Sequence, residues 1–256
     1  MTPEQLSVAH LSLQYGLKND QIRIREGIVL NVGYDSYPCY GYEFFCWRSP
    51  ECVKEMDAFI KYAKGKKCLL DVGAYHGIFS FVFSKINPDG FAYSFEPFSD
   101  PYRVLNNVIS LNNDANIETI QAALSDKSGM MKLFEANGHL NEVDIYNEKK
   151  EYWVRSITGD AFCFGLFPNI APDIIKIDCE AGELKVLRGL NNILMKHKPI
   201  IFLELHYSQL TEEDLISIME IIGYLKYIII DTETDKEIPL SSLLQQKEGE
   251  KRIVLK

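Results

Sequence analysis

The sequence predicts an α/β protein with a doubly wound, mostly parallel sheet. From residue 67 onward, short apolar segments typical of buried strands alternate with amphipathic segments typical of helices. Right-handed crossovers in such a chain place helices on both faces of the sheet. Strands are expected at the apolar segments 66–72, 91–96, 116–124, 172–179, 197–206, 225–231 and 251–256.

Helices are expected between these strands, at about 76–86, 99–113, 180–197 and 211–223. Asp100 is a suitable cap for the second of them, with Pro101 in its first turn. Thr211 is the expected cap of the last helix, and Gly223 its expected end.

The segment after residue 124 does not follow the strand–helix alternation. Residues 129–136 and 152–158 are typical of further strands or of a hairpin insertion. The residues between them, 137–151, are polar and predict a loop.

The first 66 residues differ in character from the rest. Residues 22–32 alternate like strands, and the aromatic segment 33–47 contains glycines and a proline typical of turns. Residues 51–64 carry apolar side chains at helical spacing, followed by Gly65. We predict that 1–66 form a small N-terminal extension of strands and one amphipathic helix packed on the core, and that 67–256 form the main domain.

Charge and composition argue against several classes of function. The net charge of −9 argues against a nucleic-acid partner, because such proteins usually show a basic stripe. No apolar run approaches the roughly 18 residues that a membrane span needs, and no signal peptide is apparent. The six cysteines form no C-x-x-C pair and are interpreted as reduced thiols. We therefore expect a soluble, cytoplasmic protein without a membrane partner; the oligomeric state stays open.

Acidic residues stand at or near the ends of the predicted strands. They are Asp71, Glu96, Asp178 and Glu204. Because ligands bind outside the carboxyl ends of parallel strands, these acids predict a site at that edge of the sheet.

Asp71 is followed by a turn that contains Gly73 and Gly77, and then by a helix N-terminus. Glycines allow a sharp turn and a close approach of a ligand, and helix N-termini accept anionic groups. Glu96 follows 25 positions after Asp71, where an acid commonly holds ribose hydroxyls. The pair predicts a nucleoside-bearing cofactor. The alternative is a tight turn with a capping acid, since the loop lacks the pattern G-x-G-x-x-G.

Several blocks together resemble the FkbM-type methyltransferases, which belong to the class I S-adenosyl-L-methionine (SAM)-dependent enzymes with a Rossmann-like fold. The blocks are DVGAYHGIFS, AYSFEPF, ALSDKSG, PDIIKIDCEAGELKVLRGL and KPIIFLELH. They span about residues 67–206, and IKID-x-E followed by E-L-x-V-L-R-G is the most specific part. The resemblance implies that 67–256 form a SAM-dependent methyltransferase domain.

The resemblance also implies roles for residues at matching positions. The turn under the methionine part of SAM would consist of Asp71, Gly73, Tyr75 and Gly77, and Glu96 would hold the ribose. The adenine would be flanked by Ala123, Leu124 and Asp126, while Asp178 and Glu180 would face the reacting methyl group. Two departures stand out: Tyr75 replaces a common Asn, and Glu180-Ala181-Gly182-Glu183 replaces Glu-Gly-x-Glu.

Methyl transfer to a hydroxyl needs a group that removes the hydroxyl proton. A carboxylate or histidine in this role typically accelerates the reaction by about 10²–10⁴-fold. Side chains alternate along a strand, so Lys176 shares a side with Asp178, and Glu204 with His206. We expect Asp178, Glu180, Glu204 and His206 to converge as catalytic groups.

Each of these groups also has a structural interpretation. Lys176 and Asp178 can form an ion pair, Glu180 and Glu183 can be acids of a helix's first turn, and His206 can be a capping or packing residue. Clustered oxygen ligands can bind Mg²⁺ or Mn²⁺, but two or three acids do not define a metal site, so no metal is predicted.

The predicted function is transfer of a methyl group from SAM to a hydroxyl on a sugar or another small metabolite, the oxygen preference coming from the resemblance. Two alternatives stay open. One is a nucleotide-dependent oxidoreductase or epimerase on a similar fold, which NAD(H) but not SAM would stabilise thermally. The other is a non-catalytic SAM-binding protein, which would bind SAM without turnover.

Overall fold

The computed structural model describes residues 21–33, 42, 44–113, 115–136, 139–141, 151–166, 170–246 and 248–256. Part of the predicted N-terminal extension, residues 1–20, lies outside the described residues. So do most of the predicted turn segment 33–47 and most of the predicted loop 137–151.

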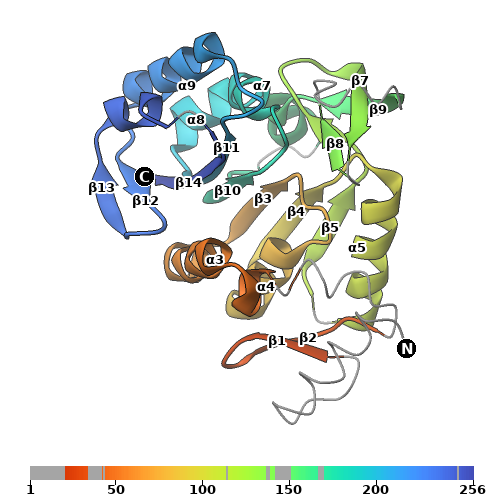
Figure 1. Cartoon of the computed structure of the whole chain (residues 1–256). Helices are drawn as coiled ribbons and strands as arrows, with labels where there is room; N and C mark the ends of the chain where they lie inside the picture. The colour runs from red at the N-terminus through yellow and green to blue at the C-terminus, as the bar shows by residue number, and fades with distance from the viewer. Residues whose placement is uncertain are drawn as a thin grey trace.

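Within the described residues, the central sheet has eight strands in the order β13-β12-β14-β11-β10-β3-β4-β5 (Figure 1). Neighbouring strands from β11 to β5 pair in parallel, while β14 runs antiparallel between β11 and β12. The predicted mostly parallel sheet is confirmed. The bounds are β3 (Cys68–Val72), β4 (Phe91–Phe95), β5 (Ile117–Ile120), β10 (Ile174–Ile177), β11 (Ile200–His206), β12 (Ile229–Asp231), β13 (Lys236–Ile238) and β14 (Glu250–Leu255).

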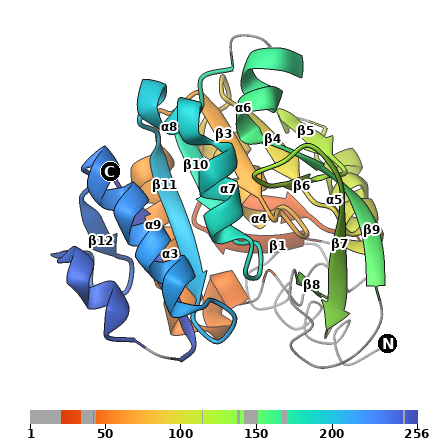
Figure 2. The same ribbon diagram turned by 90° about the horizontal axis from the view of Figure 1, so that it is seen from above.

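Helices cover both faces of this sheet, as predicted (Figures 1 and 2). One hydrophobic cluster joins one face to α3, α4 and α5, and a second joins the other face to α7, α8 and α9. The main helices are α3 (Pro50–Ala63), α4 (Ile78–Ile86), α5 (Ser99–Leu111), α7 (Glu183–Gly189), α8 (Asn191–His197) and α9 (Glu212–Leu225). Shorter turns are α6 (Gly159–Ala161), η1 (Phe44–Arg48), η2 (Phe162–Leu166) and η3 (Leu240–Leu244).

Alternation along the central strands divides their side chains between the two clusters. Leu69, Ile174 and Phe202 belong to the cluster under α3 and α4, whereas their neighbours Leu70 and Ile175 belong to the other. Because side chains two positions apart share a face, the next residues on the α3–α4 face are polar. The sheet thereby carries a row of charged groups beneath α3 and α4.

The β1 (Gln21–Arg25) and β2 (Ile28–Asn31) hairpin and α3 pack on the same apolar cluster as α4. The Phe59 ring of α3 lies edge-on to Phe79 of α4, with centroids 5.0 Å apart, and to Phe202 of β11, at 5.3 Å. Arg25 of β1 donates hydrogen bonds to the carbonyls of Phe45 and Val53. These contacts attach the N-terminal segment to the sheet face that bears the charged row.

The predicted single strand 116–124 is wrong in one respect, since it is split into β5 and β6 (Ala123–Leu124). The amide of Ala122 bonds back to the carbonyl of Ile120, 2.9 Å away, and this tight turn redirects the chain. In the described residues, β6 belongs to a second sheet of order β6-β9-β7-β8. Its other strands are β7 (Gly129–Ala136), β8 (His139–Asn141) and β9 (Glu151–Ile157), and the antiparallel β7–β9 pair confirms the hairpin insertion.

Several predicted helix ends need correction. The cap of α5 is Phe98 and not Asp100, which lies inside the first turn. The single helix predicted over 180–197 is two helices, because the chain bends at Leu190. Thr211 caps α9 as predicted, in a capping box with Asp214, but α9 continues past Gly223.

In the part of the chain that the structure describes, no helix combines the length and the apolar character that crossing a membrane requires. The described cysteines are free thiols, and Cys52 and Cys163 are buried.

Candidate active site

The turn after β3 is shaped by three residues in the left-handed region. Gly73, Tyr75 and Gly77 have φ of 77°, 49° and 81°. The buried Asp71 carboxylate accepts hydrogen bonds from the amide of Ser80 at 3.2 Å and from its hydroxyl at 2.6 Å. Burial raises the pKa of Asp71 to about 6, against the opposing effect of these bonds. Asp71 therefore holds the first turn of α4 in place from inside the fold.

Gly73 is required by a close approach of two chain segments. A Cβ at this position would lie 1.8 Å from the carbonyl oxygen of Asp178. At Gly77, a Cβ would lie 2.3 Å from the Leu105 side chain. The two glycines thus pack the turn after β3 against the loop after β10 and against α5, which brings the strand ends close together.

Glu96, at the end of β4, is bound to the same turn. Its two carboxylate oxygens accept hydrogen bonds from the amides of Tyr75 and Phe98, each at 2.8 Å. Burial raises the pKa of Glu96 to about 7, although these two bonds act in the opposite direction. Ala123, Leu124 and Asp126 follow the turn at the end of β5, the strand that pairs with β4. Leu124 is buried and Asp126 is half-buried.

A buried charge network lies at the ends of β10 and β11. The Lys176 ammonium is 3.1 Å from Glu55 of α3, 3.3 Å from Asp178 and 3.5 Å from Glu204. Arg252 of β14 pairs with Glu204 and, at 3.3 Å, with Glu55. Arg252 also pairs with Glu250 of its own strand, so two cations pair with four acidic side chains.

Electrostatics divide these acids into two kinds. Burial disfavours the ionised form of Asp178, but the charges of Lys176 and His206 outweigh it and hold the pKa of Asp178 well below its usual range. Burial and the neighbouring Asp178 instead raise the pKa of Glu204 well above its usual range. The side chain of Asp178 is 29% exposed, whereas that of Glu204 is 4% exposed. Of the two, Asp178 is therefore the ionised group that a substrate can reach.

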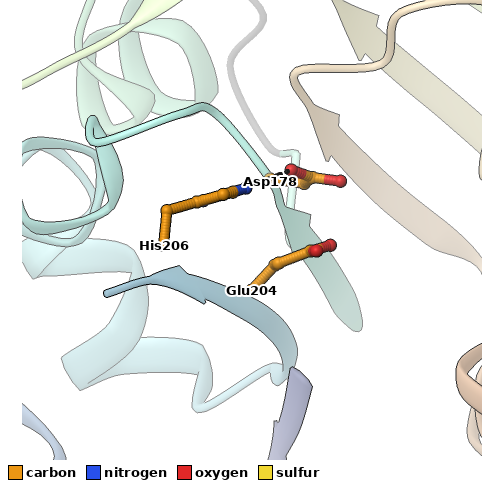
Figure 3. Close-up of side chains that lie close together, drawn as sticks. All are labelled: Asp178, Glu204 and His206. Atoms are coloured by element: carbon orange, nitrogen blue, oxygen red, sulfur yellow. Dashed lines mark ion pairs between the residues drawn. The ribbon is translucent and has the colours of Figure 1, made fainter. Parts of the chain in front are cut away.

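His206, at the end of β11, contacts acids of α7 and of the loop after β10. Its Nδ1 lies 2.6 Å from Oε1 of the buried Glu183, and its Nε2 lies 3.7 Å from both Asp178 and Glu180. Figure 3 shows the imidazole pointing toward Asp178. Burial lowers the pKa of His206, but the hydrogen bond to Glu183 and the nearby acids outweigh this effect and raise it to about 10. At neutral pH, His206 is thus a cation and not a free base.

The loop after β10 is strained at two residues that are not glycine. Glu180 and Ala181 have φ of 48° and 75°, a region that disfavours side chains other than glycine. Gly182, in contrast, has an ordinary φ of −88°. Gln209 donates a 2.7 Å hydrogen bond to Glu180, whose side chain is 26% exposed. The loop therefore presents Glu180 beside Asp178 at a conformational cost.

Asp178, Glu204 and His206 each offer one ligand atom within 4.8 Å of the others. The Lys176 ammonium, however, already lies within 3.5 Å of the two carboxylates, and His206 is paired with Glu183. A cation at this point would compete with a buried lysine, so we assign no metal to these residues.

A methyltransferase family model covers most of this arrangement. The model, described as the methyltransferase FkbM domain, matches residues 71–235, which include the ends of β3, β4, β5, β10 and β11. The chain belongs to the FkbM methyltransferase family. No curated protein matches this FkbM-family chain.

Solved structures provide distant comparisons. The FkbM methyltransferase of Methylobacillus flagellatus is 16% identical, with a TM-score of 0.48; the match covers 76% of this chain and 44% of that protein. The precorrin-6y C5,15-methyltransferase of Geobacter metallireducens is 12% identical, with 78% and 85% covered and a TM-score of 0.45. Aeropyrum pernix fibrillarin, solved with S-adenosyl-L-methionine bound, is 13% identical, with 76% and 68% covered and a TM-score of 0.44. At these identities, the comparisons carry no argument about the acceptor of this FkbM-family protein.

The structure brings together the predicted Asp178, Glu180, Glu204 and His206, and it joins Tyr75 to Glu96. It adds three residues that sequence reasoning did not place at the site: Glu55, Glu183 and Arg252. Glu183 could be suspected from its place in the IKID-x-E…E block of the FkbM family. No sequence signal identifies Glu55 or Arg252, because their partners come from distant elements.

Proposed function

We propose that this FkbM-family protein transfers a methyl group from SAM to a hydroxyl on a sugar or another small metabolite. Family membership supports methyl transfer. The specific support for SAM is the link between the two segments expected to hold it, since the amide of Tyr75 donates to the Glu96 carboxylate.

The residues present fit SAM. The turn from Gly73 to Gly77 precedes the N-terminus of α4, beside the end of β4. Each oxygen of Glu96 accepts one backbone amide, and a carboxylate oxygen has two lone pairs, so acceptor capacity for ribose hydroxyls is left over. Ala123, Leu124 and Asp126 are proposed to flank the adenine, and Tyr75 to border the methionine part.

SAM, when bound, supplies a methyl group already activated on a sulfonium. The protein's task is then to position the acceptor and to accept its proton. Asp178 and Glu180 suit this task, because their carboxylates are partly exposed at the strand ends. The buried Glu204 and His206 are proposed to hold those two carboxylates in place.

The two partly exposed carboxylates, of Asp178 and Glu180, also support a neutral acceptor that is rich in hydroxyl groups. Carboxylate oxygens accept hydrogen bonds and repel phosphates, and the whole chain carries a net charge of −9. We therefore propose a small-molecule acceptor and not a nucleic acid.

Calorimetric titration with SAM and with its demethylated product tests cofactor binding. Glu96→Ala is expected to weaken both affinities by roughly tenfold or more, as loss of a charged hydrogen-bond acceptor implies. Glu118→Ala is the matched control, because Glu118 is an exposed acid on the neighbouring strand β5. Equal affinities for the two variants would remove Glu96 from its proposed role.

Transfer of an isotopically labelled methyl group from SAM tests the acceptor. Candidate sugars and polyols are compared with RNA, amines and carboxylic acids. A labelled product that resists mild base indicates a methyl ether on a hydroxyl, whereas a methyl ester is hydrolysed. Labelling of RNA alone would overturn the small-molecule proposal, and labelling of amines alone would overturn the oxygen preference.

A further inference from the structure

Glu183 is a buried acid that makes a contact which an ordinary acid in the first turn of a helix does not make. It is the first residue of α7 and is fully excluded from solvent. Its Oε1 lies 2.6 Å from Nδ1 of His206, while its Oε2 has no hydrogen-bond partner among the described residues. A carboxylate is costly to bury unless it is paired, so the His206 ring is its counter-ion.

The bond to Glu183 fixes which way the imidazole faces. With Nδ1 engaged by Glu183, Nε2 is directed to the other side of the ring, 3.7 Å from Asp178 Oδ1 and 3.7 Å from Glu180 Oε1. Asp178 and Glu180 are the two partly exposed carboxylates of the site, and because each lies 3.7 Å from the same nitrogen, their like charges repel each other. A cationic ring beside both of them offsets that repulsion.

Glu180 needs such a restraint. It stands in the left-handed region, as does Ala181 after it, so the loop has lower-energy conformations available. Two contacts oppose that relaxation: the hydrogen bond from Gln209 and the attraction to His206.

We propose that Glu183 is a positioning residue for methyl transfer, which acts through His206 to hold the Asp178 and Glu180 carboxylates together where the acceptor binds. This inference rests on the proposed function, since it assigns a task to the same site. Glu183 itself does not touch the acceptor, because it is fully buried.

The charge of His206 is central to this role, and the groups around it come from several elements. The surrounding charged groups are Glu183 of α7, Asp178 and Glu180 of the loop after β10, Lys176 of β10, Glu204 of β11, and Glu250 and Arg252 of β14. Their acids raise the pKa of His206 to about 10 against the effect of burial, with Glu183 the largest favourable contributor. Neutralising Glu183 removes that contribution.

The test uses NMR of the imidazole nitrogens in the intact protein, with Glu183→Gln as the variant. The His206 signals are assigned by their loss in His206→Asn. In the wild type they are expected to stay those of an imidazolium up to about pH 9, whereas in Glu183→Gln they titrate nearer the ordinary value of about 6.5. Glu213→Gln is the control, because Glu213 is an exposed first-turn acid of α9.

Kinetics of methyl transfer supply the second measurement. At about pH 8, Glu183→Gln is expected to lower kcat by about 10- to 100-fold, as misplaced reacting groups do. The affinity for SAM should stay within about twofold of wild type, because SAM is held by other residues. Glu183→Asp keeps the charge and is expected to recover a raised His206 pKa and part of the activity, which a merely structural role does not predict.

The outcomes separate this inference from the proposed function. A neutral His206 in the wild type at pH 8 overturns the inference, whatever the activity. A normal kcat in a folded Glu183→Gln with neutral His206 overturns it as well and leaves methyl transfer intact. A wild type that binds SAM but methylates no acceptor overturns the proposed function and with it the positioning role, even where the NMR result holds.

Discussion

The Glu55 carboxylate of α3 lies 3.1 Å from the Lys176 ammonium of β10, with both side chains at least 98% excluded from solvent. Lys176 also lies over the ring of Phe79, 4.9 Å from its centroid. The helix that precedes the family-model match therefore supplies a counter-ion to the lysine that faces Asp178. Through this contact, α3 is part of the support of the site.

Removing Glu55 should be costly. Glu55→Ala leaves Lys176 and Arg252 short of one carboxylate in a dry environment, and we expect a loss of about 3–5 kcal/mol in the free energy of unfolding. Urea denaturation measures it. Lys61→Ala is the control, because the Lys61–Asp235 pair is more than half exposed, so solvent screens it and its loss should change stability little. Equal losses of unfolding free energy in the two variants would show that the buried pair contributes no more than the exposed one.

The approach of Asp178 to Gly73 predicts a difference between two glycine variants. Gly27 and Gly73 have nearly the same φ, 76° and 77°, but a Cβ at Gly27 meets nothing within 4 Å. Gly27→Ala should therefore cost only the left-handed strain, about 1–2 kcal/mol. Gly73→Ala should cost several kcal/mol more and weaken SAM binding, because the loop of Asp178 must move. Denaturation and calorimetry measure both, and similar stabilities would contradict the close approach.

The strained loop predicts a stabilising substitution. Ala181 has φ of 75°, and Ala181→Gly removes the clash of its Cβ with the backbone. After the entropy cost of a glycine, we expect a net gain of up to about 1 kcal/mol in the free energy of unfolding. Ala58→Gly inside α3 should instead destabilise by about 1 kcal/mol. Loss of stability in both variants would argue against the left-handed conformation at Ala181.

The pKa of Glu96 predicts how SAM affinity depends on pH. The folded-state pKa is raised to about 7, so the folded protein holds a proton there that the unfolded chain releases near pH 4. The stability from that proton is present at acid pH and lost as pH rises toward 7. Ribose hydroxyls favour the ionised carboxylate, so affinity should rise up to about tenfold per unit below pH 7 and level off above it.

Calorimetry with adenosine isolates this effect, because adenosine carries the ribose without the titratable amino acid part of SAM. Glu96→Gln should show no such rise between about pH 5.5 and pH 8.5. A pH-dependent affinity that persists in Glu96→Gln would assign the titration to another group.

How much of this could be predicted from the sequence depends on how local each signal is. The acids at or near strand ends, Asp71, Glu96, Asp178 and Glu204, were predictable because a short apolar segment that ends in a polar residue is a local signal. The split after Ile120 was not, because one backbone hydrogen bond decides it. The contribution of Glu55 and Arg252 was also beyond reach, since it depends on how α3 and β14 pack on the sheet.

The charge states of the site residues could not be predicted from the sequence either. Period-two alternation puts His206 beside Glu204, and a histidine at a strand end suggests a base. The buried Glu183 makes it a cation instead, and the distance that shows this is a tertiary contact. We therefore propose that His206 holds its neighbours in place and does not remove the proton of the acceptor.

The insertion of β14 between β11 and β12 bears on how the chain assembles as it leaves the ribosome. β12 and β13 emerge before β14, yet in the described part of the chain β12 is joined to the parallel strands through β14. A nascent chain that ends before residue 250 lacks β14 beside β11 and lacks Arg252, so Glu55 has Lys176 but not its second cationic partner. The charge network around Glu55 is therefore complete only once β14, the last strand of the chain to be synthesised, has joined the sheet.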